Sequence, residues 1–159
     1  MKLERKLLAC SLLCVVFGWG GLFGVIVSLE ELKSDSGVGL RPCPSSPNCV
    51  SSLASESDST HFIEPFKFGR APEAAWNALK SAVLSLSRVT IVKESRTYLH
   101  VEARTLFFRF VDDVEFELVS SEEVIHVRSS SRLGYGDLGV NRRRVEKIRA
   151  RFIQLNHVE

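Results

Sequence analysis

The C-terminal two thirds of the chain alternates between two hydrophobic patterns. Residues 62–68 alternate apolar and polar side chains around Pro65, which predicts a first strand at the edge of a sheet. Pro72 then marks the start of a helix that ends near Ser87. The apolar residues of this helix recur at steps of three and four, namely Ala75, Trp76, Leu79, Val83 and Leu86.

Four stretches rich in β-branched and aromatic residues follow, and they predict a meander of antiparallel strands. They are Val89–Glu94, Tyr98–Arg104, Phe110–Val119 and Val124–Ser130. A last helix is expected over Asp137–Leu155, with an apolar stripe of Val145, Ile148, Phe152 and Leu155. The order predicts an α+β fold: a two-layer domain with an antiparallel sheet of about five strands and two helices on one face.

The N-terminal region has a different pattern. Residues 7–29 carry no charged side chain and, at about 1.5 Å per residue, are long enough to cross the hydrocarbon core of a bilayer. Lys2, Arg5 and Lys6 precede this stretch, whereas Glu30 and Glu31 follow it. The positive-inside rule therefore predicts cytoplasmic residues 1–6, a single transmembrane helix over 7–29, and a C-terminal domain outside the cytoplasm, periplasmic in a Gram-negative-type envelope.

Two other kinds of leader fit this stretch less well. A cleaved secretory signal has a shorter apolar core and ends at a small-x-small site, which is missing from residues 28–31. A lipoprotein signal at Cys10 would need an apolar region before it, and only a few residues separate Cys10 from the charged start. The uncleaved anchor is the preferred interpretation.

Residues 30–60 are expected to form a linker, because they are rich in serine, glycine and proline. Five residues separate Cys43 from Cys49 within it. In an oxidising compartment such a pair can close a small ring, so we predict a disulfide. Two free thiols are the alternative, and a metal site is disfavoured because two further ligands are not close in the sequence.

Composition limits the remaining possibilities. With 159 residues, 45% of them hydrophobic, the chain has room for one folded domain over residues 61–159. A net charge of +2 does not indicate a polyanionic partner, and no aromatic platform accompanies the arginines, so no nucleic acid is expected. Known enzyme signatures, including G-x-S-x-G and H-E-x-x-H, are absent, and no cofactor is expected.

Asp112 is a carboxylate in an unusual position. Strand alternation places it on the same side as Val114, Phe116 and Leu118, where a buried carboxylate needs a cation or several donors. If the strand begins only at Asp113, the neighbouring carboxylates of Asp112 and Asp113 simply mark a turn or the start of the strand. A hydrolase could use Asp112 or Asp113 as a general base, with Arg132 or Arg142 stabilising developing negative charge.

The segment between the last strand and the last helix is the second candidate site. Its three glycines precede a helix start that Asp137 or Asn141 can cap. The candidate ligand-binding residues for a phosphate or carboxylate are Ser131, Arg132, Asp137, Asn141 and Arg142. The alternative is a capped helix whose arginines pair with Asp112, Asp113 or Glu115.

Three segments together resemble one known family. They are CPSSPNCVSS at 43–52, FVDDVE at 110–115, and the stretch from Ser129 to Arg144 that contains SSSR and DLGVNRRR. In this order and at these separations they resemble the family called domain of unknown function 1499. The resemblance implies an envelope or plastid-type protein, often with an N-terminal signal or anchor, and it implies no particular reaction.

Taken together, these patterns favour a non-enzymatic envelope module, held to the membrane by residues 7–29. Its partner would be a small anionic ligand, a lipid headgroup or a membrane protein, bound through the region from Arg132 to Arg144. The hydrolase is one alternative. A structural role is the other, in which the charged motifs lock the last helix to the sheet.

Overall fold

The computed structural model describes residues 39–69, 71–106 and 108–156. Two helices and six strands make up this part of the chain. In chain order they are β1 (Cys49–Ser51), β2 (Phe66–Lys67), α1 (Pro72–Leu84), β3 (Val89–Glu94), β4 (Tyr98–Arg104), β5 (Val111–Val119), β6 (Val124–Ser131) and α2 (Val140–Asn156). A short 3-10 turn, Ser120–Glu122, joins β5 to β6.

The strands form one antiparallel sheet in the order β1-β6-β5-β4-β3, with β2 also paired to β6. The predicted meander from β3 to β6 is confirmed, and each consecutive pair is antiparallel. The predicted first strand shrinks to the two residues of β2. It does lie at an edge, because β1 and β2 pair with different ends of the same strand, β6.

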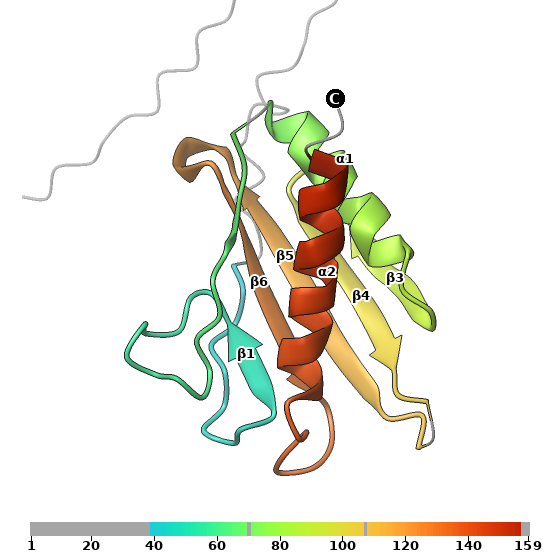
Figure 1. Ribbon diagram of the computed structural model, residues 1–159. Helices are drawn as coiled ribbons and strands as arrows, with labels where there is room; N and C mark the ends of the chain where they lie inside the picture. Colours follow the sequence, from blue (N-terminus) through green and yellow to red (C-terminus); the bar gives the residue numbers. More distant parts are fainter. Residues whose placement is uncertain (1–38, 70, 107, 157–159) are drawn as a thin grey trace, which may run out of the picture. The chain divides into compact units, whose positions relative to one another are not determined.

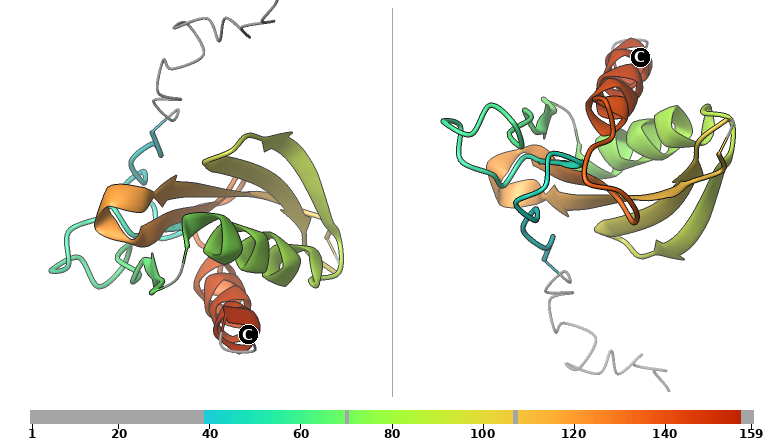
Figure 2. Two further views of the ribbon diagram at one scale, coloured as in Figure 1. Left: turned by 90° about the horizontal axis from the view of Figure 1, so that it is seen from above. Right: turned by 90° about the horizontal axis from the view of Figure 1, so that it is seen from below.

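Both helices cover the same face of the sheet (Figures 1 and 2). The core lies between these layers. Leu79 and Val83 of α1 meet Val145 and Phe152 of α2 over strand residues such as Phe116. The rings of Phe66 and Phe116 contact edge to face, with centroids 5.9 Å apart. The α+β class with two helices is therefore confirmed, with six strands where about five were expected.

The sequence-based boundary at residue 61 places the start of the folded part too late. Residues 39–60, expected to be linker, include β1, and Val50 belongs to the hydrophobic core. The loop that follows is also tied to the sheet, because Ser52 N donates to the carbonyl of Val127 at 2.9 Å. A strand of three residues is too short to show an alternation of apolar and polar side chains, so the sequence did not predict β1 among the surrounding prolines and serines.

Residues 39–44 pass over the face of the sheet opposite the helices (Figure 2). Leu40 is buried, and so are Tyr98, Glu115 and Arg128, whose positions in their strands point to that face. Both faces of the central strands are thus partly covered, which explains why charged residues in this sheet are buried.

The predicted transmembrane segment, residues 7–29, lies outside the described residues. None of the helices in residues 39–156 that the structure describes is both long enough and apolar enough to span a bilayer.

Candidate functional site

A buried cluster of polar side chains joins the first, second and third motifs of the chain. Its centre is Asn141 in the first turn of α2, which is fully buried. Its side-chain amide donates to the carbonyl of Asn48 at 3.0 Å and to Ser131 Oγ at 2.9 Å. Its side-chain oxygen accepts a bond from Ser129 Oγ at 2.6 Å. We call these four residues, with Asp112 and Arg144, the Asn141 cluster.

Asp112 does face the core, as strand alternation predicted. It is buried on β5 and pairs with Arg144 of α2. Arg144 Nη1 also donates to Asn141 Oδ1 at 2.7 Å and to Ser129 Oγ at 3.2 Å. A buried carboxylate is tolerated here because the guanidinium neutralises it and further donors complete the network.

Asp137 caps α2. Its Oδ1 accepts a bond from Gly139 N at 2.9 Å, and its Oδ2 accepts from Asn141 N at 2.7 Å. Gly139 has a φ of +75°, where a Cβ atom would lie 3.1 Å from Nη1 of Arg143, so glycine is required at this turn. The glycine-rich segment therefore serves the helix start.

Asp113 and Arg132 meet on the opposite face of the sheet. Arg132 binds Asp113 through Nε at 2.9 Å and Nη2 at 2.7 Å, and it reaches Glu102 at 2.7 Å. His100 Nε2 lies 2.7 Å from Asp113 Oδ1. The bonds from Arg132, and then the bond from His100, hold the pKa of Asp113 below its usual range, although burial opposes them.

A second charged group, Tyr98, Glu115 and Arg128, lies buried on this same face. Glu115 accepts bonds from the Tyr98 hydroxyl at 2.7 Å and from Arg128 Nη1 at 2.9 Å. Burial, reinforced by the neighbouring Glu115, raises the pKa of Tyr98 well above its ordinary value. The alternative in which arginines of the last helix pair with these carboxylates holds for Asp112 alone, because Asp113 pairs with Arg132 of the preceding loop and Glu115 with Arg128 of β6.

Of the residues in the hydrolase hypothesis, Asp113 and Arg132 come together as an ion pair, whereas Asp112 and Arg142 bind other partners. Asp112 points to the helices and Asp113 to the other face. Arg142 donates instead to the backbone carbonyls of Ser59 and Thr60, at 3.2 and 3.1 Å. In the Asp113–Arg132 pair the guanidinium binds the carboxylate itself and lowers its pKa, which makes it a weaker general base and counts against that chemistry. The five candidate ligand contacts remain predictions, and their polar groups already bond to the protein itself.

The disulfide between Cys43 and Cys49 is present, with Cα atoms 5.7 Å apart. It closes the loop that delivers Asn48 to the cluster, where Ser131 N donates to the Asn48 carbonyl at 3.0 Å. In the ranges that the structure describes, no group of three or more His, Cys, Asp and Glu side chains is arranged to hold a metal ion.

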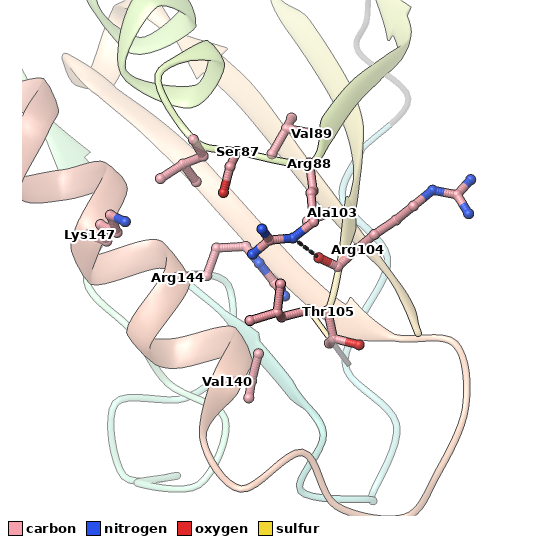
Figure 3. A pocket seen from close by; sticks show the side chains of 11 residues that line it. Ser87, Arg88, Val89, Ala103, Arg104, Thr105, Val140, Arg144 and Lys147 are labelled. Carbon is pink, nitrogen blue, oxygen red and sulfur yellow. Dashed lines mark hydrogen bonds between the residues drawn. The ribbon is translucent and has the colours of Figure 1, made fainter. Parts of the chain in front are cut away.

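A cationic pocket lies beside the Asn141 cluster, between α2, the start of β3 and the end of β4 (Figure 3). Its volume is about 280 Å³. The residues that line it are Leu86, Ser87, Arg88, Val89, Ala103, Arg104, Thr105, Leu106, Val140, Arg144 and Lys147. Among these described lining residues, none is acidic.

Within this pocket the guanidinium groups of Arg88 and Arg144 approach one another, while the side chain of Arg104 points away (Figure 3). Arg104 pairs with Glu102 on the other face. Arg144 is balanced by Asp112, but Arg88 and Lys147 form no ion pair among the described residues. The pocket therefore holds a surplus of positive charge.

Arg88 is fixed in place by the backbone. Its φ of +62° is unusual for a residue with a side chain, and its Nε donates to the Arg104 carbonyl at 3.2 Å. Its own carbonyl accepts a bond from Arg104 N at 3.0 Å. Sequence reasoning missed this residue because Arg88 lies in the short link between a helix and a strand, where a lone arginine forms no motif.

The chain matches the model of a known protein family. The family described as "Protein of unknown function (DUF1499)" matches residues 39–152, which include the Asn141 cluster and the cationic pocket. No curated protein matches the chain.

Proposed function

The chain belongs to this family of unknown function, and we propose that it is a non-enzymatic envelope module that binds an anionic group in the pocket of Arg88, Arg144 and Lys147. The observation that carries the proposal is the surplus of cations around a pocket without an acidic residue in its described lining. Like charges held close together repel one another, and a bound anion removes that repulsion.

The pocket offers donors suited to a phosphate, sulfate or carboxylate group. Arg88 supplies the guanidinium nitrogens that its bond to Arg104 leaves free, and Lys147 supplies a mobile ammonium one turn beyond Arg144. Thr105 also lines this space, but its hydroxyl oxygen accepts a bond from Phe110 N at 2.9 Å. Since Arg88 is already held by backbone bonds, little side-chain entropy is lost when an anion binds.

The Asn141 cluster has a supporting role in this proposal. By neutralising one side of Arg144, Asp112 holds its guanidinium at the wall of the pocket. The motif residues 48, 112, 129 and 141 thus act by positioning α2 against the sheet. The structural alternative and ligand binding are then compatible. The buried motif residues hold α2 and Arg144 at the wall of the pocket, and the unpaired cations Arg88 and Lys147 bind the anion.

The proposal includes a location. Residues 7–29 would form a single transmembrane anchor, residues 1–6 would lie in the cytoplasm, and the domain would lie outside it. The Cys43–Cys49 disulfide supports this, because such bonds persist in oxidising compartments. An alkaline phosphatase fused after Glu159 is expected to be active, since that enzyme needs disulfides. A fusion that is made at full length but is inactive would contradict the location.

Isothermal titration of the purified full chain with inorganic phosphate tests the binding. We expect the substitutions Arg88→Gln and Lys147→Gln together to weaken binding by about a hundredfold or more, since each of the two charged contacts is worth about 1.5 to 3 kcal/mol. The matched control is Arg151→Gln, which removes an exposed cation of α2 that, among the described residues, bonds only to Gln154. No detectable phosphate binding, or equal affinity in the double variant and the parent, would refute the proposal.

A further inference from the structure

A set of exposed apolar side chains lies at one end of the domain, next to the cationic pocket. It comes from two loops, residues 105–106 and 108–110 between β4 and β5 and residues 132–139 between β6 and α2, which lie at the same lower end in Figure 1. We call it the apolar rim. Its members are Leu106, Phe108, Phe110, Leu133, Tyr135 and Leu138, with exposed fractions of 60, 77, 47, 68, 78 and 92%.

From this arrangement we propose that the apolar rim docks onto the surface of an anionic lipid bilayer, with a lipid headgroup in the cationic pocket. The inference rests on the proposed function, since it names the source of the anion. Isolated exposed apolar residues are common, but six large ones on two adjoining loops form a patch of the kind that marks an interaction surface.

The rim and the pocket are continuous. A cavity of about 480 Å³ lies between the two loops, and its lining includes Phe108, Phe110, Leu133 and Leu138 as well as two carboxylates that already have protein partners, Asp112 and Asp137. Thr105, Leu106 and Val140 line both this cavity and the cationic pocket. An apolar surface that borders a cationic one matches the two layers of a lipid monolayer, where acyl chains lie beneath charged headgroups.

The shape and charge of the rim favour a bilayer as the occupant. The apolar side chains of the rim are exposed, and two further cations, Arg109 and Arg143, lie in or beside its loops. Neither arginine forms an ion pair within the described residues, so both keep a net positive charge. Such cations are attracted to anionic lipid, and a tyrosine such as Tyr135 is typical of the membrane interface.

The backbone around the rim is also unusual. Leu138 has a φ of +53° and is almost fully exposed, and Arg109 has a φ of +54°. Turns in this conformation normally contain glycine, asparagine or aspartate. A leucine there incurs both backbone strain and apolar exposure, and insertion into lipid would offset the second cost. The carbonyl of Leu138 is held by Arg143 Nη1 at 2.8 Å, which fixes the loop in this shape.

The test uses the full chain reconstituted into vesicles, so that the predicted anchor is present in every sample. The environment-sensitive fluorophore NBD is attached to Leu138→Cys, or to Phe108→Cys, in a Cys10→Ser, Cys14→Ser background that leaves the disulfide intact. Leu53→Cys is the matched control, because Leu53 is 53% exposed but lies outside both loops. Quenching is measured with doxyl-labelled lipid in vesicles of phosphatidylcholine, with and without phosphatidylglycerol.

We expect doxyl lipid to quench positions 108 and 138, but not 53, only when phosphatidylglycerol is present. Arg88→Gln with Lys147→Gln should abolish this quenching. Equal quenching at 138 and 53 would overturn the docking, and a positive phosphate titration would then leave the anion pocket standing. Quenching that does not depend on lipid charge would also overturn the docking. So would protection of position 138 from both doxyl lipid and aqueous iodide, which would indicate that another protein covers the rim. Failure of the proposed function shows separately, as absent phosphate binding.

Discussion

Replacing Asp112 by asparagine separates the role of the Asn141 cluster from that of a surface charge. The substitution keeps the shape of the side chain but removes its charge, and leaves the Arg144 guanidinium without its carboxylate. The side chains of Asp112 and Arg144 are only 2% and 11% exposed. Breaking a buried pair by removing one partner costs about 3 to 5 kcal/mol.

The lower end of that range applies here. Arg144 keeps its bonds to Asn141 and Ser129, and its other side borders the open pocket. We therefore expect Asp112→Asn to lower the free energy of unfolding by about 3 kcal/mol, which at about 4 °C per kcal/mol is a fall of about 12 °C in Tm. Urea unfolding of the oxidised full chain, followed by circular dichroism, measures it.

Arg142→Gln is the matched control. The sequence made Arg142 a candidate to bind an anion or to pair with a carboxylate, but it bonds to two backbone carbonyls near the surface, and its loss should cost less than about 1 kcal/mol. The reasoning would be refuted if Asp112→Asn stayed within about 1 kcal/mol of the parent, or if both variants lost the same amount.

Three further predictions follow from the same contacts. The double substitution Cys43→Ser, Cys49→Ser should lower the free energy of unfolding by about 2 kcal/mol, a modest loss because the ring that the disulfide closes is small. In urea unfolding, a reductant should destabilise the parent by the same amount and leave the variant unchanged. Asp113 has a lowered pKa in the folded state, so its stabilisation is present above the unfolded-state value of about 3.9 and is lost as pH falls through the folded-state pKa. The Asp113→Asn variant should therefore be less stable than the parent at pH 7, and its free energy of unfolding should fall less steeply at acid pH. Urea unfolding of both proteins at several pH values measures this, and an equal dependence on pH in the two would contradict it. Gly139→Ala should lower Tm, at a cost of about 1 kcal/mol or more, because its φ is +75° and the added methyl crowds Arg143; an unchanged Tm would argue against this turn.

The sequence predicted those helices and strands in which apolar residues recur at a regular spacing. Alternation along residues 111–119 correctly placed Asp112 on the core side, and the stripe of Val145, Ile148 and Phe152 correctly placed α2 on the sheet. The same reasoning could not identify Arg144 as the partner of Asp112. Several arginines occur within one turn of α2, and which of them faces the sheet depends on the rotation of the helix in the packed domain.

The cationic pocket and the apolar rim could not be derived in this way. Arg88 and Lys147 are far apart in the sequence, and only the pairing of β3 with β4 and the packing of α2 bring them together. The rim did leave a signal. Leu133 and Leu138 are large apolar residues in a glycine-rich loop, where polar residues are expected, and Phe110 was assigned to a strand instead of a loop.

Anomalous diffraction from crystals of the protein grown with selenate tests the central claim most directly. We expect a selenium peak in the pocket, within hydrogen-bond distance of the guanidinium groups of Arg88 and Arg144, and no peak there in the Arg88→Gln, Lys147→Gln variant. Selenate bound at Arg132 or Arg142 with the pocket free of anion would contradict it.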